Sequence, residues 1–132
     1  MKNKDLLKYA LEALENSYSP YSNYKVGAAL LMKNGRVIKG TNIENASYGL
    51  TNCAERSALF TAYSLGYRKE DIKGIAIASL SNEPASPCGA CRQVISELME
   101  GDAFVVYGND QGKVYEMKVD ELLPGAFSKE NL

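Results

Sequence analysis

The spacing of apolar residues predicts a helix followed by a β-hairpin in the first third of the chain. Apolar side chains near the N-terminus recur at three- and four-residue steps, which indicates an amphipathic helix. They are Leu6, Leu7, Tyr9, Ala10, Ala13 and Leu14. Ser19-Pro20 ends this helix, because a residue that precedes proline disfavours helical backbone angles. An apolar run at 26–32 then predicts a strand, Asn34-Gly35 is a dipeptide typical of tight hairpin turns, and 36–42 follows as the partner strand.

Helices and strands alternate in the remainder of the chain. Segments 52–63 and 88–99 have helical apolar periodicity, and Gly66 is a plausible end for the first of them. Short apolar runs predict strands at 74–80 and 103–107, with a weaker one at 113–119. This order predicts an α/β fold with a mixed sheet, in which strands joined through helices run parallel and are buried on both faces. The 132 residues contain no repeat or linker, so we expect one domain over 1–132.

The chain has three cysteines and no histidine. The lack of histidine excludes Ser–His and Cys–His nucleophile pairs, histidine-ligated metals and imidazole as a general base. Fifteen Lys and Arg against sixteen Asp and Glu give a net charge of −1, which argues against a polynucleotide partner. No stretch approaches the roughly 20 apolar residues that span a bilayer, so we expect no membrane association. Free thiols and the lack of a secretory signal favour a cytoplasmic location.

All three cysteines lie where helices are predicted to begin. Cys88 and Cys91 are three positions apart, so both thiols face one side of a helix and are able to bind one metal ion. A helix N-terminus favours thiolate over thiol, and Cys53 occupies the same kind of position. Three thiolates around Zn²⁺ leave a net charge of −1, which the two helix ends and Arg56 are suited to balance.

Other interpretations of the cysteines remain open at this point. They are also explained as ordinary buried thiols. Cys88-Gly-Ala-Cys91 resembles a redox dithiol, although that chemistry gives Cys53 and Glu55 no role. A structural zinc ion is usually bound by four protein ligands. This chain has no fourth cysteine and no histidine, so a structural site would need a ligand from a second subunit. Three ligands and one open position form the catalytic arrangement. Glu55, two residues after Cys53, is then the candidate proton carrier, although a first-turn glutamate is also explained by the helix dipole.

These motifs resemble the cytidine deaminases, in particular the small three-cysteine enzymes that act on free nucleosides. The signature is Cys53-Ala54-Glu55 followed by Pro87-Cys88-Gly-Ala-Cys91. Further similarity lies in Asn42-Ile-Glu44-Asn and in Pro124-Gly-Ala-Phe127, so the resemblance covers nearly the whole chain. It implies a three-layer α/β/α fold with a five-stranded mixed sheet.

The resemblance also implies roles for individual residues. Cys53, Cys88 and Cys91 would bind one Zn²⁺, and Glu55 would carry protons while cytidine or 2′-deoxycytidine is hydrolysed to the uracil nucleoside and ammonia, a step of pyrimidine salvage. Asn42 and Glu44 would contact the ribose. Tyr24, the Ala54 N–H and the Ser86 carbonyl would contact the base. Arg56 would donate hydrogen bonds to the zinc-bound thiolates. Phe127 would enter a neighbouring subunit's pocket, which implies a homotetramer with shared active sites.

Three rival functions share some of these features. A non-catalytic zinc-binding module would bind the metal without turnover. A deaminase of a modified cytosine nucleoside would share the two cysteine motifs, and only the Asn-Ile-Glu-Asn and Pro-Gly-Ala-Phe segments count against it. A polynucleotide-editing deaminase is disfavoured by the charge balance. The sequence does not rank cytidine against deoxycytidine.

Overall fold

The hairpin around Asn34-Gly35 opens a five-stranded sheet. In the computed structural model, which describes residues 1–132, Gly35 takes the positive φ of 90° that this turn requires. The sheet order is β2-β1-β3-β4-β5. The strands are β1 (Val26–Met32), β2 (Val37–Thr41), β3 (Ile72–Ser79), β4 (Phe104–Gly108) and β5 (Val114–Lys118). The helices are α1 (Leu7–Ala13), α2 (Ala54–Ser64), α3 (Gly89–Leu98) and α4 (Val119–Leu122).

Strand directions follow from the connections. β3 and β4, joined through α3, are parallel neighbours, whereas β1 pairs antiparallel with both β2 and β3. β2 and β3, joined through α2, therefore also run in the same direction, with β1 between them. β5 pairs antiparallel with β4. The predicted mixed sheet is confirmed, and so is the burial of β3 and β4 on both faces.

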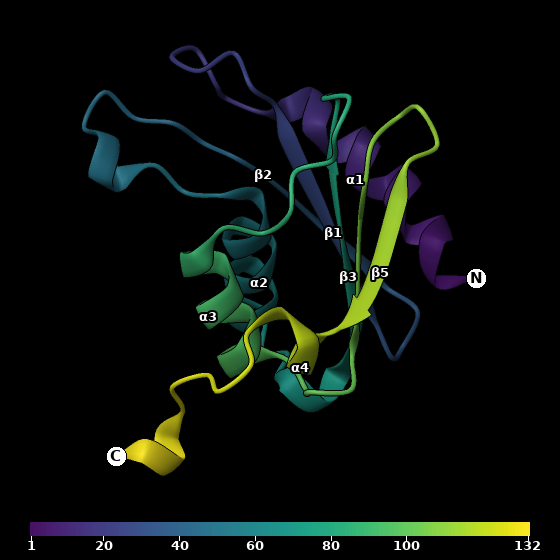
Figure 1. Ribbon diagram of the computed structural model, residues 1–132, viewed down its shortest axis with the longest axis vertical. Helices are drawn as coiled ribbons and strands as arrows, with labels where there is room; N and C mark the ends of the chain where they lie inside the picture. The colour runs from purple at the N-terminus through teal and green to yellow at the C-terminus, as the bar shows by residue number, and fades with distance from the viewer.

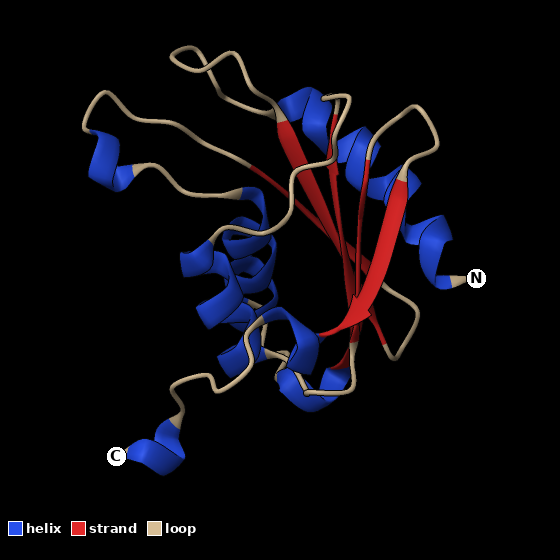
Figure 2. Cartoon of the chain, viewed as in Figure 1, coloured by secondary structure: helices blue, strands red, loops and turns tan.

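Successive side chains along each strand point to opposite faces of the sheet and so contribute to two separate hydrophobic cores. Ala28, Leu30 and Met32 of β1 pack with α2 and α3 in one core, and Ala29 and Leu31 pack with α1 in the other. Figures 1 and 2 show the result, with α1 on one face of the sheet and α2 with α3 on the other. This arrangement confirms the three-layer α/β/α fold. No helix is both long and apolar enough to cross a membrane.

Most elements begin or end within two residues of the expected bounds; β3, for example, begins at Ile72 rather than at residue 74. Two elements differ in their type of secondary structure as well. The last strand ends at Lys118, one residue early, because Val119 begins the short helix α4, in which the Glu121 carboxylate accepts a hydrogen bond from the Lys118 N–H at 2.8 Å. The N-terminal helix is α-helical only over Leu7–Ala13 and continues as 3₁₀ turns on both sides. Its burial against the sheet is as the periodicity predicts.

Candidate active site

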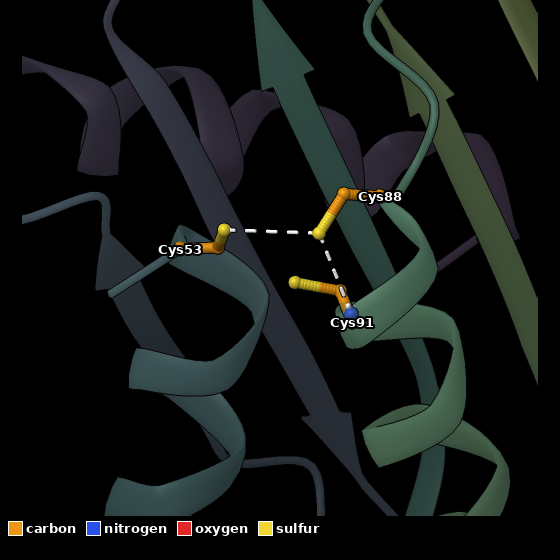
Figure 3. Close-up of side chains that lie close together, drawn as sticks. All are labelled: Cys53, Cys88 and Cys91. Carbon is orange, nitrogen blue, oxygen red and sulfur yellow. Dashed lines mark hydrogen bonds between the residues drawn. The ribbon is translucent and has the colours of Figure 1, made fainter. Parts of the chain in front are cut away.

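The beginnings of α2 and α3 bring the three cysteines together. Cys53 and Cys88 are the residues that immediately precede the two helices, and Cys91 lies in the first turn of α3. The Cys91 N–H donates a hydrogen bond to the Cys88 sulfur at 3.5 Å, which caps α3 with a metal-ligand residue. Figure 3 shows the three thiols converging from the two helix ends.

The sulfur positions fit a tetrahedral zinc ion. All three sulfur atoms lie within 4.8 Å of one another, and those of Cys53 and Cys88 are 3.9 Å apart. Zinc–sulfur bonds of about 2.3 Å in a tetrahedron place neighbouring sulfurs about 3.8 Å apart. No histidine exists in the chain to complete a four-ligand site. The donor set is therefore suited to a zinc ion with one position left for another ligand.

The charge of the cluster is controlled by hydrogen bonds. The Cys91 thiol and the Arg56 guanidinium, whose Nη2 lies 3.3 Å from the Cys53 sulfur, lower the pKa of Cys53 to about 5. The pKa of Cys91 is raised, because its thiol donates to the Cys53 thiolate and is itself desolvated. The Arg56 Nε is buried without a hydrogen-bond partner. The Arg56 guanidinium therefore lies beside the Cys53 sulfur.

Glu55 points inward at the start of α2. Its side chain is only 5% exposed, although Glu is among the residues least often buried. Burial raises the pKa of the Glu55 carboxyl above its usual range. A carboxyl with a raised pKa is suited to taking up and releasing protons near neutral pH.

Glu55 and two of the cysteines line a cavity of about 290 Å³. Most of the predicted site residues meet there: Tyr24, Asn42, Glu44, Cys53, Ala54, Glu55 and Cys88. Ser86, whose carbonyl the resemblance implies as a contact of the base, also lines the cavity. The rest of the lining comes from residues that the sequence did not single out, namely Ser22, Val26, Thr51, Asn52, Ile77 and Ala85. Cys91, Arg56 and Phe127 are not part of the lining.

Asn42 and Glu44 are held in place by the loop that precedes β1. The Asn42 Oδ1 accepts hydrogen bonds from the Ser17 hydroxyl and the Val26 N–H, and its Nδ2 donates to the Tyr24 carbonyl at 2.8 Å. One Nδ2 hydrogen of Asn42 remains without a protein partner. Glu44 accepts hydrogen bonds from the Ser22 hydroxyl and N–H, which lower the pKa of its carboxyl.

Tyr24 forms one wall of the cavity. Its hydroxyl is 3.0 Å from the Ser81 hydroxyl, so the partner that this hydroxyl needs comes from the segment after β3. The ring leaves an aromatic face at the cavity.

Phe127 lies apart from the cavity of its own chain. It is 58% exposed, and its carbonyl accepts a hydrogen bond from the Gln93 Nε2 at 2.9 Å. The chain after α4 passes α3 and ends away from the sheet (Figure 1). The aromatic ring is therefore presented outward on the surface of the single chain.

Comparison with known proteins agrees with this site. Residues 1–108 match the family model "Cytidine and deoxycytidylate deaminase zinc-binding region". The chain belongs to the cytidine deaminase family. A cytidine deaminase of Halalkalibacterium halodurans is 57% identical over 132 residues, which cover 100% of this chain and 98% of the relative.

A crystal structure from the same family extends the agreement to the fold. The cytidine deaminase of Burkholderia pseudomallei superposes with a TM-score of 0.92 at 50% identity, covering 96% of this chain and 100% of the other. A blasticidin-S deaminase of Bacillus cereus is more distant, at 30% identity over 131 residues, covering 95% of this chain and 91% of the relative. This chain is therefore more similar to the two cytidine deaminases named above than to the blasticidin-S deaminase.

Proposed function

We propose that this chain, as one catalytic domain over 1–132, hydrolyses cytidine and 2′-deoxycytidine to uridine and 2′-deoxyuridine with release of ammonia. The observation that carries the proposal is a buried carboxyl, Glu55, beside a three-sulfur zinc site in one cavity. The family and the relatives named above supply the substrate class.

The metal site would be formed by Cys53, Cys88 and Cys91. When zinc is bound there, it lowers the pKa of a coordinated water and so supplies a nucleophile at neutral pH. Arg56 stabilises the Cys53 thiolate through its hydrogen bond at 3.3 Å, and the helix starts of α2 and α3 add partial positive charge. These groups keep three thiolates compatible with a partly buried site.

Glu55 is the proton carrier of the proposed mechanism. Attack at C4 of the cytosine ring requires a proton at N3, and the departing amino group requires a second proton at its nitrogen. One carboxyl is sufficient if it acts twice. It takes a proton from the attacking water and releases it at N3; it then takes the second proton from the hydroxyl now bonded to C4 and releases it at the amino nitrogen, which leaves as ammonia while C4 becomes a carbonyl carbon. Burial raises the pKa of Glu55, which brings it closer to the pH at which such a group works best.

The remaining cavity groups would orient the nucleoside. Asn42 offers its free Nδ2 hydrogen and Glu44 its remaining lone pairs to the ribose hydroxyls. Tyr24 offers an aromatic face to the base. The Ala54 N–H, at the start of α2 and without an intrahelical partner, and the Ser86 carbonyl are suited to hydrogen bonds with the base edge.

We further propose a homotetramer in the cytoplasm, with no polynucleotide partner. Phe127 is exposed and absent from the cavity of its own chain, which supports a role for its ring in the cavity of a neighbouring subunit. The free thiols of the metal site suit a reducing compartment. The net charge of −1 disfavours binding to a polyphosphate backbone.

The proposal is tested with purified, zinc-loaded protein and free cytidine. We expect the ultraviolet spectrum of cytidine to change to that of uridine, with one zinc per chain. A protein that binds zinc but leaves the spectrum unchanged would support the non-catalytic zinc module instead. Turnover of blasticidin S in place of cytidine would support the modified-nucleoside alternative.

A further inference from the structure

Two buried polar side chains lie outside the cavity and are not explained by the proposed reaction. Ser79 is 1% exposed and Asn109 is 3% exposed, yet neither lines the cavity. Ser79 is the last residue of β3, and Asn109 directly follows β4. Since β3 and β4 are parallel neighbours, the two residues lie at the same edge of the sheet. Buried polar groups are costly unless they are hydrogen-bonded, so their partners indicate what they do.

Asn109 uses its whole side chain to join two segments. Its Nδ2 donates hydrogen bonds to the carbonyls of Ser81 and Asn82, both at 3.0 Å. Its Oδ1 accepts from the N–H groups of Gln111 and Lys113, also at 3.0 Å. Asn109 therefore holds the segment after β3 against the turn between β4 and β5.

Ser79 holds the same segment from its other side. Its hydroxyl accepts a hydrogen bond from the Ala85 N–H at 3.1 Å and lies 3.1 Å from the Ser81 hydroxyl. A further tie comes from Glu83, whose carboxylate accepts a hydrogen bond from the Tyr115 hydroxyl on β5 at 2.8 Å. Residues 80–87 form no helix or strand, so these side chains replace the backbone ladder that would otherwise fix their position.

The segment held in this way, residues 80–87, forms part of the cavity wall. Ala85 and Ser86 line the cavity, and the Ser81 hydroxyl contacts the hydroxyl of Tyr24, which lines the same cavity. We propose that Asn109 and Ser79 are positioning residues for the deamination proposed above: they fix residues 80–87 so that Ala85 and Ser86 meet the substrate base. The inference rests on that proposed function.

The proposal predicts a change in substrate binding without a change in the metal site. Displacement of the wall by a fraction of an ångström weakens contacts that the base makes in the ground state and the transition state alike, which raises KM more than it lowers kcat. We expect zinc to be retained, because Cys53 immediately precedes α2 and Cys91 lies in α3, and because the Arg92 Nε donates a hydrogen bond to the Pro87 carbonyl, next to Cys88, at 2.8 Å. A residue that only stabilised the fold would reduce the active fraction, and hence the apparent kcat, with KM unchanged.

The test compares three variants of the zinc-loaded full chain. Asn109→Asp keeps the acceptor for Gln111 and Lys113 but loses the two donor hydrogens. Ser79→Ala independently releases the Ala85 N–H, and it keeps the test informative if Asn109→Asp fails to fold. Val106→Ala is the control, because Val106 is fully buried on β4 but packs in the core on the α1 face. Zinc content, thermal unfolding, kcat and KM for cytidine are measured for each.

For Asn109→Asp and Ser79→Ala we expect KM to rise on the order of 10-fold, kcat to change by less than about 3-fold, and zinc to stay at one per chain. For Val106→Ala we expect a lower melting temperature and an unchanged KM. Unchanged KM in both Asn109→Asp and Ser79→Ala would overturn the inference. Loss of zinc from these two variants, or the same rise of KM in Val106→Ala, would also overturn it. Turnover by the unmodified chain is measured first, so failure of the proposed function is recognised separately.

Discussion

Three sulfur atoms and one carboxyl group carry the proposed chemistry, and each depends on its surroundings for its charge. Hydrogen bonds from Cys91 and Arg56 favour the thiolate of Cys53, whereas burial favours the protonated form of Glu55. A thiolate cluster beside a carboxyl that accepts and releases protons is what hydrolytic deamination needs. The side chain of Arg56 is therefore as relevant to the metal as the cysteines themselves.

Removing the Arg56 guanidinium is expected to weaken zinc binding. Arg56→Gln deletes the charge and the donor at 3.3 Å from the Cys53 sulfur, so we expect zinc affinity to fall about 10–100-fold. The measurement is competition with a chromophoric chelator. Arg36→Gln, which removes an equal charge from the exposed hairpin turn, is the control and should leave the affinity unchanged. Equal affinities for both variants would show that the Arg56 hydrogen bond does not support the metal.

The sequence predicts the chemical groups of the site but not their supports. Cys53, Glu55 and Cys88 were predictable, because each lies in a motif whose spacing reflects a helix start. Ser22, which holds Glu44, and Asn109, which holds the cavity wall, lie in no motif. Their partners are distant in the chain, so only the folded structure identifies them.

At the scale of elements, two glycines set how closely helices approach the sheet. A Cβ at Gly40 on β2 would lie 2.4 Å from the Ala58 nitrogen and 2.7 Å from the Ala54 carbonyl oxygen of α2. A Cβ at Gly27 on β1 would lie 2.0 Å from the Ala10 carbonyl oxygen of α1. Each of the two helices thus packs closely against a glycine of the sheet, α1 on one face and α2 on the other. Of these two helices, only α2 carries site residues.

Substitution of the two glycines should separate stability from activity. Gly40→Ala and Gly27→Ala both force a helix away from the sheet, so each is expected to lower the free energy of unfolding by at least about 1–3 kcal/mol. Only Gly40→Ala moves the start of α2, and we expect kcat per folded protein to fall only there. Denaturant unfolding and active-fraction kinetics check this. An equal loss of kcat in Gly27→Ala would contradict the assignment of the site to the α2 face.

The local spacing of apolar residues and turn residues predicts most helices and strands. It does not predict which distant strands pair with one another. The hairpin and the helices that begin near Cys53 and Cys88 follow from turn residues and periodicity. The antiparallel pairing of β1 with β3 joins residues separated by 40 or more positions and leaves no local signal. The helix α4 was missed because Val119 continues the apolar pattern of β5 and is buried in either conformation.

At the scale of the whole molecule, the exposed position of Phe127 bears on the proposed oligomer. Gln93 on α3 holds its carbonyl, only two residues after Cys91, so the C-terminal segment is fixed to the helix that carries the metal site. The ring itself stays outside its own cavity. An aromatic side chain presented in this way is suited to a neighbour's cavity rather than to its own.

Mixed oligomers test whether Phe127 acts on a neighbouring subunit. We expect Phe127→Ala to lose most cytidine turnover and Glu55→Gln to lose nearly all of it. When the two inactive variants are unfolded and refolded together, cavities that retain Glu55 receive Phe127 from the other variant, so part of the activity should return. Refolding each variant alone is the control. No recovery in the mixture, with mixed oligomers verified by mass, would contradict a shared site.

The central claim is that Glu55 transfers protons in a zinc-containing cytidine deaminase site. The most direct measurement is the rate of uridine and ammonia formation by zinc-loaded wild-type protein and by Glu55→Gln, with zinc content determined for both. The account predicts one zinc per chain in each protein and a rate lower by at least about 10²–10⁴-fold in Glu55→Gln, since both proton transfers depend on that carboxyl. Full activity of a zinc-loaded Glu55→Gln protein would contradict the mechanism.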